Sequence, residues 1–371
     1  MEKSKVYFTD MRARNGIGLL DKLETLIKRA GLETIDFDRK FVAIKIHFGE
    51  LGNLAFLRPN FARRVADSIK SLGGMPFLTD CNTLYVGSRK NAIDHMETAE
   101  RNGFSPITTG CQVIIADGLK GTDDALVPLS GTRYVKQAKI GRAIMDADIV
   151  VSLNHFKGHE MTGFGGALKN LGMGSGSRAG KMEQHRNGKP EVNRLACRRC
   201  RGCRGICAQN AISYDDKGYA CIDVKKCVGC GRCIGVCNFD AIFNPNSGSN
   251  DELNMKMAEY AKAVVDGRPS FHISIVNQVS PYCDCHAEND VPIIPDVGMF
   301  ASFDPVALDM ACADMVNKQP VMCGSRLEQN GHAEGNDHFK DNHPSTDWRV
   351  CLRHAEKIGV GRMDYELVEV K

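Results

Sequence analysis

The chain has 371 residues, of which 43% are hydrophobic, and its formal net charge at pH 7 is +3. Its length exceeds that of a single small domain and suits either one large domain carrying an insert or two to three smaller domains. The near-neutral charge and the lack of a long basic run argue against nucleic acid as a partner, and the absence of an apolar run of membrane-spanning length argues against a membrane.

Short apolar runs alternate with amphipathic segments through the first half of the chain. Strands are predicted at residues 5–9, 41–47, 76–79, 113–116 and 149–153, and helices at 19–30, 61–72, 91–102 and 135–145. This alternation is typical of an α/β fold with a mostly parallel sheet and helices on both faces.

The same alternation resumes in the last third of the chain. It predicts helices at 254–265, 305–317 and 351–358 and strands at 272–276 and 367–370, with Asp304 as N-cap and Pro305 in the first helical turn. We therefore expect one α/β domain in two parts, residues 1–187 and 247–371. A small α+β insert, residues 188–246, separates them and is bounded by turn-rich segments.

Eight of the sixteen cysteines lie in this insert, in two copies of the pattern C-x-x-C-x-x-C-x-x-x-C. Three thiolates at steps of three can hold three corners of a cubane, while the fourth cysteine serves the other cluster. The spacing predicts two 4Fe–4S clusters. Crossed ligation assigns Cys197, Cys200, Cys203 and Cys237 to the first cluster, and Cys227, Cys230, Cys233 and Cys207 to the second.

Zinc ribbons and disulfides are the alternatives for these cysteines. Four cysteines within eleven positions crowd one tetrahedral zinc ion, which usually binds two separated C-x-x-C pairs. The chain has sixteen cysteines and its N-terminus has no apolar stretch of signal-peptide length, so we expect a reducing, anaerobic cytoplasm. These conditions disfavour disulfides.

Four arginines lie among the cysteines of the first copy: Arg198, Arg199, Arg201 and Arg204. Guanidinium groups beside a negatively charged cluster favour its reduced state. Alternatively, they form a solvated basic face on which a redox partner protein docks.

The run from Ile222 to Cys233, together with the two cysteine patterns, resembles the bacterial two-cluster ferredoxins. The resemblance covers about sixty residues and implies a ferredoxin-type domain with two 4Fe–4S clusters. That family usually has proline after the fourth cysteine, whereas Ala208 and Asn238 stand there in this chain. The departure affects the turn but removes no ligand.

Polar residues follow most of the predicted strands of the α/β domain. They are His47, Glu50, Asp80, Cys81, Asn82, Asp117, Asn154, His155, Lys157, His159, Asn277 and Gln278. Because ligands bind outside the carboxyl ends of strands in open α/β sheets, this set predicts a site at one sheet edge. Any one of these residues alone is more typical of a helix cap or turn than of a binding site.

Glycines recur between Gly158 and Gly180, which predicts either a backbone that wraps closely around a ligand or a flexible lid. The stretch does not match a phosphate-binding loop, because Ser175 stands at the place of its first glycine and Met182 at that of its Ser/Thr. In and around it, four side chains are candidates to bind or protonate a substrate: Lys157, His159, Lys169 and His185.

The segment Cys283-Asp284-Cys285-His286 offers two thiols and an imidazole. With Cys81 or His47 to complete the set, Cys283, Cys285 and His286 predict a third metal site. A redox-active thiol pair is a second interpretation, and cysteines with neither role are a third.

Several motifs outside the cysteine patterns resemble the bacterial and archaeal family called domain of unknown function 362, which often carries an inserted ferredoxin module. They include residues 45–50, 80–85, 154–159, 165–174 and 180–185, and the stretch from Asp296 to Asp309. The resemblance implies the fold and the clusters but no reaction.

Two functions remain open. One is a redox enzyme that passes single electrons from the clusters to a substrate or cofactor in the α/β domain, and the other is an electron carrier or metal- or cofactor-assembly factor without substrate chemistry of its own. The sequence indicates neither the substrate nor the oligomeric state.

Overall fold

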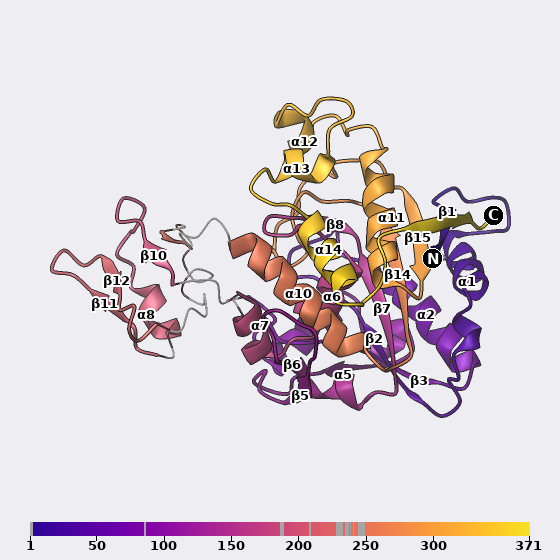
Figure 1. Ribbon diagram of the computed structural model, residues 1–371, viewed down its shortest axis with the longest axis horizontal. Helices are drawn as coiled ribbons and strands as arrows, with labels where there is room; N and C mark the ends of the chain where they lie inside the picture. The colour runs from indigo at the N-terminus through magenta and orange to yellow at the C-terminus, as the bar shows by residue number, and fades with distance from the viewer. Residues whose placement is uncertain are drawn as a thin grey trace.

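The computed structural model describes residues 3–84, 87–185, 189–207, 209–227, 233, 237, 239, 241–243 and 249–371. Most of them form an α/β body, residues 3–185 and 249–371. The described residues between 189 and 243 form a cysteine-rich module at one end of the long axis (Figure 1). Both ends of the chain lie in the body, on the neighbouring strands β1 and β16.

The body is built on an eight-stranded sheet with the order β16-β1-β15-β14-β7-β2-β3-β4. Its strands are β1 (Ser4–Asp10), β2 (Phe41–Lys45), β3 (Met75–Asp80), β4 (Gln112–Ile115), β7 (Ile149–His155), β14 (Ser270–Val276), β15 (Gly298–Ser302) and β16 (Tyr365–Glu369). Only β15 runs antiparallel to its two neighbours. The predicted mostly parallel sheet is confirmed.

Helices cover both faces of the sheet, as predicted. One face packs on α1 (Leu19–Arg29), α2 (Pro59–Ser71) and α3 (Ala92–Arg101), and the other on α6 (Ala167–Ser175), α10 (Ser249–Val265), α11 (Pro305–Asn317) and α14 (Arg349–Lys357). Short elements complete the body: η1 (Leu32–Thr34), α4 (Pro106–Thr109), α5 (Arg142–Asp146), α7 (Arg178–His185), α12 (Arg326–Gln329) and α13 (His338–Asn342).

Asp304 caps α11, as predicted, by accepting hydrogen bonds from the N–H groups of Val306 and Ala307. The apolar strands β7 and β14 are almost wholly buried, because helices cover the sheet on both sides. No helix in the described part of the chain has the length and apolar character needed to cross a bilayer.

The predicted helix at 135–145 is wrong over its first half. Residues Gln137–Gly141 form β6, which pairs with β5 (Asp124–Pro128) in an antiparallel hairpin, and only Arg142–Asp146 are helical. Ala138 and Ile140 are buried, whereas Gln137, just before them, is exposed. This period of two belongs to a strand, and in so short a segment it resembles part of a helical pattern.

The glycine-rich stretch folds into the body as β8 (Lys157–His159), β9 (Gly163–Gly165), α6 and α7. A Cβ on Gly172 would lie 2.1 Å from the carbonyl oxygen of Met257 in α10. A Cβ on Gly158 would lie 2.4 Å from the carbonyl oxygen of Pro281. These two glycines therefore allow close approach of the protein's own backbone, and the stretch is packed into the body as strands and helices, unlike a flexible lid. A wrap around a ligand stays a prediction.

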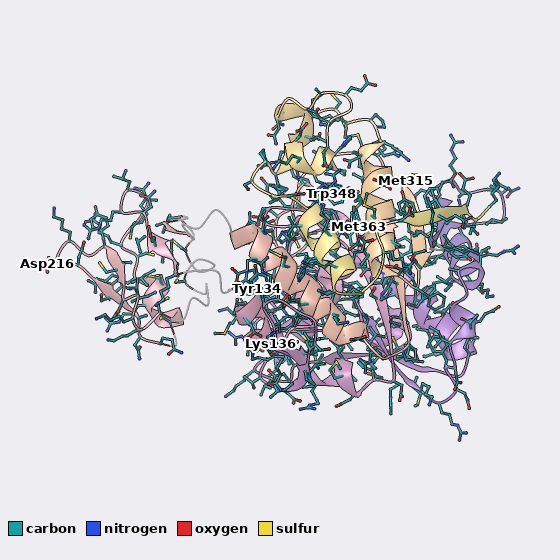
Figure 2. All side chains as sticks on the ribbon, in the orientation of Figure 1. Tyr134, Lys136, Asp216, Met315, Trp348 and Met363 are labelled. Carbon is teal, nitrogen blue, oxygen red and sulfur yellow. The ribbon has the colours of Figure 1, made fainter. Side chains whose placement is uncertain are left out.

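The cysteine-rich module contains α8 (Gly202–Ile206) and two small antiparallel pairs, β10 (Glu191–Val192) with β13 (Ile242–Phe243), and β11 (Ile212–Tyr214) with β12 (Ala220–Ile222). Its core among the described residues is small: Cys203, Ile212, Ala220, Cys233 and Ile242. Asp216 lies at its outer end, away from the body (Figure 2). The predicted boundaries at 188 and 246 fall outside the described residues.

Candidate functional site

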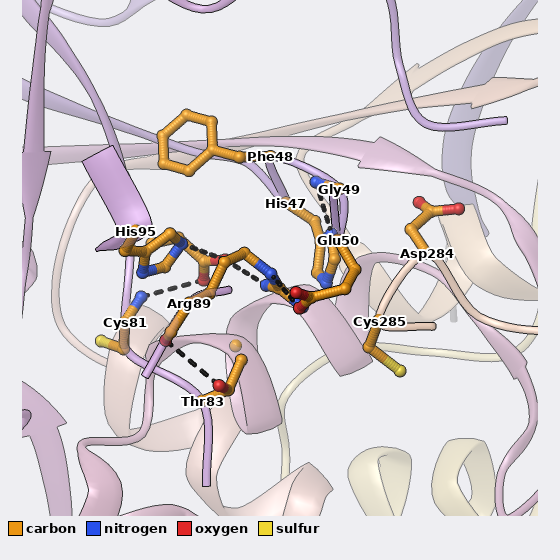
Figure 3. A network of polar contacts seen from close by, with 12 residues as sticks. His47, Phe48, Gly49, Glu50, Cys81, Thr83, Arg89, His95, Asp284 and Cys285 are labelled. Atoms are coloured by element: carbon orange, nitrogen blue, oxygen red, sulfur yellow. Dashed lines mark hydrogen bonds and ion pairs between the residues drawn. The ribbon is translucent and has the colours of Figure 1, made fainter. Parts of the chain in front are cut away.

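Charged side chains from adjacent strands meet at the carboxyl edge of the sheet. Lys45 Nζ, at the end of β2, lies 2.8 Å from Asp80 Oδ1, at the end of β3. Arg89 contacts both Asp80, at 3.5 Å, and Glu50, at 3.0 Å (Figure 3). All four residues are buried. Burial acts to raise the pKa of Asp80, but the neighbouring charges together, with that of Lys45 the largest, outweigh it and lower that pKa.

An amide pair extends this network to β7 and α6. Asn170 Oδ1 accepts a hydrogen bond from Lys45 Nζ at 2.7 Å. Asn170 Nδ2 donates to Asn154 Oδ1, also at 2.7 Å. Lys45 and Asn170 are separated by 125 residues in the chain, so the fold alone brings them together.

A second polar pair occupies the outer part of the same edge. Asn82 donates to Asp117 Oδ1 through its backbone N–H, at 2.9 Å, and through its side-chain amide, at 2.8 Å. Burial raises the pKa of Asp117 to about 6. The strand-end residues Asp80, Asn82, Asp117 and Asn154 thus lie together at one edge, where the sequence predicted a site.

The loop 281–286 presents alternate side chains to different parts of the body. Asp284 Oδ2 lies 2.9 Å from His155 Nδ1 and 3.3 Å from Lys157 Nζ. Burial favours the neutral acid, but the charges of His155 and Lys157 outweigh it and hold the pKa of Asp284 well below its usual range. Hydrogen bonds from Glu50 N–H to Asp284 O and from His343 to Pro281 O anchor the loop.

Cys283 and Cys285 point to the other side of this loop, toward α6. Lys169 Nζ donates to Cys283 Sγ at 2.9 Å, and the N–H of Cys285 donates to the same sulfur at 3.4 Å. Burial opposes the thiolate form of Cys283, but a hydrogen bond from the Cys285 thiol and the Lys169 charge outweigh it. They hold the pKa of Cys283 well below its ordinary value.

His159 completes a group with these two cysteines. One ligand atom each of His159, Cys283 and Cys285 lie within 4.8 Å of one another. His159 Nδ1 accepts the N–H groups of Met161 at 3.1 Å and Thr162 at 3.2 Å. Burial lowers the pKa of His159 to about 4, so the ring is neutral near pH 7.

The remaining members of the predicted metal set lie apart from this group. His286 Nε2 contacts Glu160 Oε1 at 3.0 Å, and this hydrogen bond raises the pKa of His286. Cys81 Sγ donates to Ser175 O at 3.3 Å. Figure 3 shows Cys81 across the Arg89–Glu50 contact from Cys285. Cys81 is thus not positioned with Cys283, Cys285 and His286, because β3 ends on the far side of the charged network. A metal held at this loop stays a prediction.

Two other candidate residues lie within electrostatic range of Lys169. His185, at the end of α7, is half-buried, and burial together with the charges of His159 and Lys169 lowers its pKa to about 3. His47 follows β2, and its Nδ1 accepts the N–H of Gly49 at 3.0 Å. Burial and the charge of Arg89 hold the pKa of His47 well below its usual value.

Sequence reasoning missed three charges of the site: Lys45 and Arg89, which are buried, and Glu160, which is partly exposed. Lys45 sits inside an apolar strand pattern, where a lysine is exceptional unless paired, and this was the available signal. Arg89 and Glu160 lie in loops without a pattern that distinguishes them from solvated charges.

Cysteines from both copies of the pattern meet in the module. Cys197, Cys200, Cys203 and Cys237 line one small cavity, together with Tyr214 and Phe239. Cys207 Sγ accepts the N–H of Ala211 at 3.3 Å. No disulfide joins the cysteines within the described ranges, and Cys230 lies outside them.

Three arginines of the first copy, Arg198, Arg199 and Arg201, also line that cavity. Arg198, Arg199, Arg201 and Arg204 are all exposed. Arg199 lies over the Tyr219 ring and Arg201 over the Tyr214 ring, each 5.4 Å from the ring centroid. These contacts hold the two guanidinium groups at the surface of the module.

Curated proteins match parts of the chain. A thiosulfate reductase electron transfer subunit of Salmonella typhi is 31% identical over 64 residues, which are 16% of this chain and 33% of that protein. A thylakoid-associated protein of Synechocystis is 27% identical over 152 residues, 39% of this chain and 40% of that protein. A putative dimethyl sulfoxide reductase iron–sulfur subunit of Halobacterium salinarum is 29% identical over 112 residues, 28% of this chain and 41% of that protein. The chain therefore spans less than half the length of these relatives.

Solved structures resemble the chain at low sequence identity. The lactate racemase apoprotein from Thermoanaerobacterium thermosaccharolyticum is 12% identical with a TM-score of 0.39, and the match covers 74% of this chain and 51% of that one. A protein from Thermotoga maritima is 13% identical with a TM-score of 0.40, over 81% of this chain and 59% of that one. The family model described as "Domain of unknown function (DUF362)" matches residues 42–314, and this chain therefore belongs to that family, as its motifs predicted.

Proposed function

We propose that this protein is an iron–sulfur protein that binds two 4Fe–4S clusters and passes single electrons from them to a substrate or cofactor in the α/β body. In this proposal residues 188–246 form a ferredoxin-type domain, inserted between the two parts of the body, 1–187 and 247–371. A redox partner protein supplies or accepts the electrons. Two relatives are named as an electron transfer subunit and an iron–sulfur subunit, which supports iron–sulfur electron transfer.

The observation that carries the proposal is the cavity lined by Cys197, Cys200, Cys203 and Cys237. Four thiols that face one space are the donor set of a cubane cluster, and the fourth comes from the other copy of the pattern, as crossed ligation requires. The second cluster would be held by Cys227, Cys230, Cys233 and Cys207. When bound, such clusters accept and release one electron at a time.

In the body, the proposed roles belong to the side chains around Cys283. The ammonium groups of Lys157 and Lys169 would bind an anionic substrate group or the charge that develops on reduction. His159 and His185, neutral near pH 7, would deliver a proton to the reduced substrate. Each of the four would act without a change in backbone structure, because the surrounding network already fixes the edge of the sheet.

A second function is favoured by a different observation. The buried charges Lys45, Asp80, Arg89 and Glu50 pair with one another, so this part of the edge is stable without a ligand. A ferredoxin-like carrier, or a metal- or cofactor-assembly factor without its own substrate chemistry, needs only such a stable body and no substrate site in it. The exposed arginines would then dock an acidic partner.

The cluster assignment is tested by anaerobic reconstitution. We expect close to eight irons and eight sulfides per chain, and Cys237→Ser is expected to lose about half of them, since it removes a ligand of one cluster only. Cys221→Ser is the matched control, because Cys221 lies in β12 of the same module and is not in either ligand set. Stoichiometric zinc without sulfide would contradict the proposal.

The choice between the two functions rests on what the body binds. A small molecule that copurifies with the anaerobic protein, and is oxidised or reduced when the clusters change state, supports the enzyme. Complete reversible cycling of the clusters with a partner protein, with no small molecule bound or converted, supports the carrier.

A further inference from the structure

The contact between Lys169 and Cys283 is an ion pair in a protected position. Cys283 is fully buried, and Lys169 Nζ lies 2.9 Å from its sulfur. The backbone N–H of Cys285 donates to the same sulfur. Two donors aimed at one buried sulfur stabilise a thiolate and not a thiol, because a thiol is a weak acceptor.

The neighbouring histidine is arranged as a proton donor. Since His159 Nδ1 accepts two backbone N–H groups, the proton of the neutral ring lies on Nε2. A histidine that ligates a metal instead donates from one nitrogen to a protein acceptor and keeps the lone pair of the other free. The lysine ammonium would also repel a cation at this position. Both features fit thiolate chemistry better than a metal site.

The second thiol lies beside the thiolate and is reachable. Cys285 is only half-buried, and its sulfur is within 4.8 Å of the Cys283 sulfur. The loop between the two cysteines is one residue long and turns back on itself, with His286 N–H donating to Cys283 O at 3.1 Å. The two sulfurs must approach by about 3 Å at most to reach the bonding distance of a disulfide, about 2.05 Å.

We propose that Cys283 and Cys285 form a redox-active dithiol that exchanges with a small organic disulfide, with Lys169 and His159 as its positioning residues. The source of electrons that restores the dithiol is the pair of clusters, so this part rests on the proposed function. A small substrate is indicated because only Cys285 is accessible, and it lies within a loop that is anchored on both sides.

The exchange balances in two steps. The Cys285 thiol attacks one sulfur of the substrate disulfide, forms a mixed disulfide and releases one substrate thiol, which takes the Cys285 proton. The Cys283 thiolate then attacks the Cys285 sulfur, forms the Cys283–Cys285 disulfide and releases the second half of the substrate as a thiolate. Two electrons, delivered singly, and one proton restore the starting pair.

The disulfide is tested directly on the anaerobic holoprotein. The protein is equilibrated in mixtures of reduced and oxidised dithiothreitol, its remaining thiols are alkylated, and the peptide that carries Cys283 and Cys285 is mapped by mass spectrometry. We expect reversible conversion from a doubly alkylated peptide to an unalkylated one that lacks two hydrogens. Cys323→Ser, which removes an exposed cysteine elsewhere, is expected to leave this conversion unchanged.

The role of Lys169 is tested by charge. Lys169→Met is expected to slow the formation of the Cys283–Cys285 disulfide by oxidised dithiothreitol at pH 7 about ten-fold or more, because it removes the cation that stabilises the Cys283 thiolate, which closes the disulfide. Lys169→Arg, which keeps the charge, is expected to retain most of the rate. Fluorescence of Trp348, the only tryptophan of the chain, verifies that each variant is folded.

Three outcomes separate the ideas. If Cys283 and Cys285 are alkylated in every dithiothreitol mixture, the redox-active dithiol is overturned, even if both clusters assemble. A stoichiometric metal that resists anaerobic purification and needs Cys283, Cys285 and His159 also overturns it. A reversible disulfide that reduced clusters fail to reduce upholds the dithiol and contradicts the electron route of the proposed function.

Discussion

In the α/β body the polar groups of the candidate site are buried and paired with each other, whereas the cysteines of the module surround a cavity that exposed arginines also line. Lys45, Asp80 and Arg89 are each almost inaccessible to solvent, and every one has an ionic partner. The module's hydrophobic cluster has five buried residues within the described ranges, and two of them are cysteines.

This difference separates two ways of stabilising a site. The body has large apolar cores on both faces of its sheet, and these can offset the cost of burying charges. A core as small as that of the module rarely suffices for a stable fold without a metal or a cross-link. We therefore infer that the body folds without a cofactor and that the module depends on its clusters.

The largest expected effect follows from cluster removal. After anaerobic oxidation and chelation of iron, protease cuts within residues 189–243 should become at least about ten-fold faster, because metal binding and folding are coupled in such small units. The urea unfolding transition of the body, followed by Trp348 fluorescence, should stay in place. If the iron-free module still resisted protease, or if the body unfolded together with the iron-free module, the two regions would not differ in their dependence on clusters.

An intermediate effect is expected from the buried ion pair. Lys45→Met should lower the free energy of unfolding of the body by about 3–5 kcal/mol, because it removes the ammonium group 2.8 Å from the buried Asp80 carboxylate and leaves only the longer contact with Arg89, at 3.5 Å, as an ion pair with a permanent charge. Trp348 fluorescence in urea measures this change. Arg63→Met is the control: Arg63 and Asp67 form an exposed pair at 2.8 Å on α2, and its loss should cost no more than about 1 kcal/mol. Equal effects of the two substitutions would mean that burial of the network contributes nothing.

The smallest effect concerns pH. Asp309 is buried in α11 and accepts hydrogen bonds from Ala167 N–H and Leu168 N–H at the start of α6. Burial raises its pKa from 3.8 to about 7. Between these two pH values Asp309 is protonated in the folded state and ionised in the unfolded state. The contribution of Asp309 to stability therefore falls as pH rises through that window.

Asp309→Asn should remove this slope, which is at most about 1.4 kcal/mol per pH unit. Urea unfolding at several pH values between about 5 and 7 measures it. Asp10 has the opposite sign, since the hydrogen bond from Lys22 lowers its pKa in the folded state, and Asp10→Asn should leave the slope in this window unchanged. An unaltered slope in Asp309→Asn would show that this carboxyl is ionised in the folded protein at all these pH values.

The sequence by itself determined the features that depend on local pattern. Apolar runs located β1, β2, β3, β4, β7 and β14, and the Asp304–Pro305 pair located the start of α11. These predictions succeeded because a period of two or of 3.6 residues is set by the backbone of each element. The cysteine spacing is local in the same way, and the structure brings Cys237 to the first three cysteines of the other copy.

The tertiary structure alone decided which side chains meet. Lys169 and Cys283 are 114 residues apart, and His155 and Asp284 are 129 residues apart. The order of strands decided these meetings, placing β14 beside β7 and β15 antiparallel between β14 and β1. It also put His159, and not Cys81, beside the two cysteines. Long-range pairing depends on how buried faces pack against each other, and no local period in the sequence records that choice.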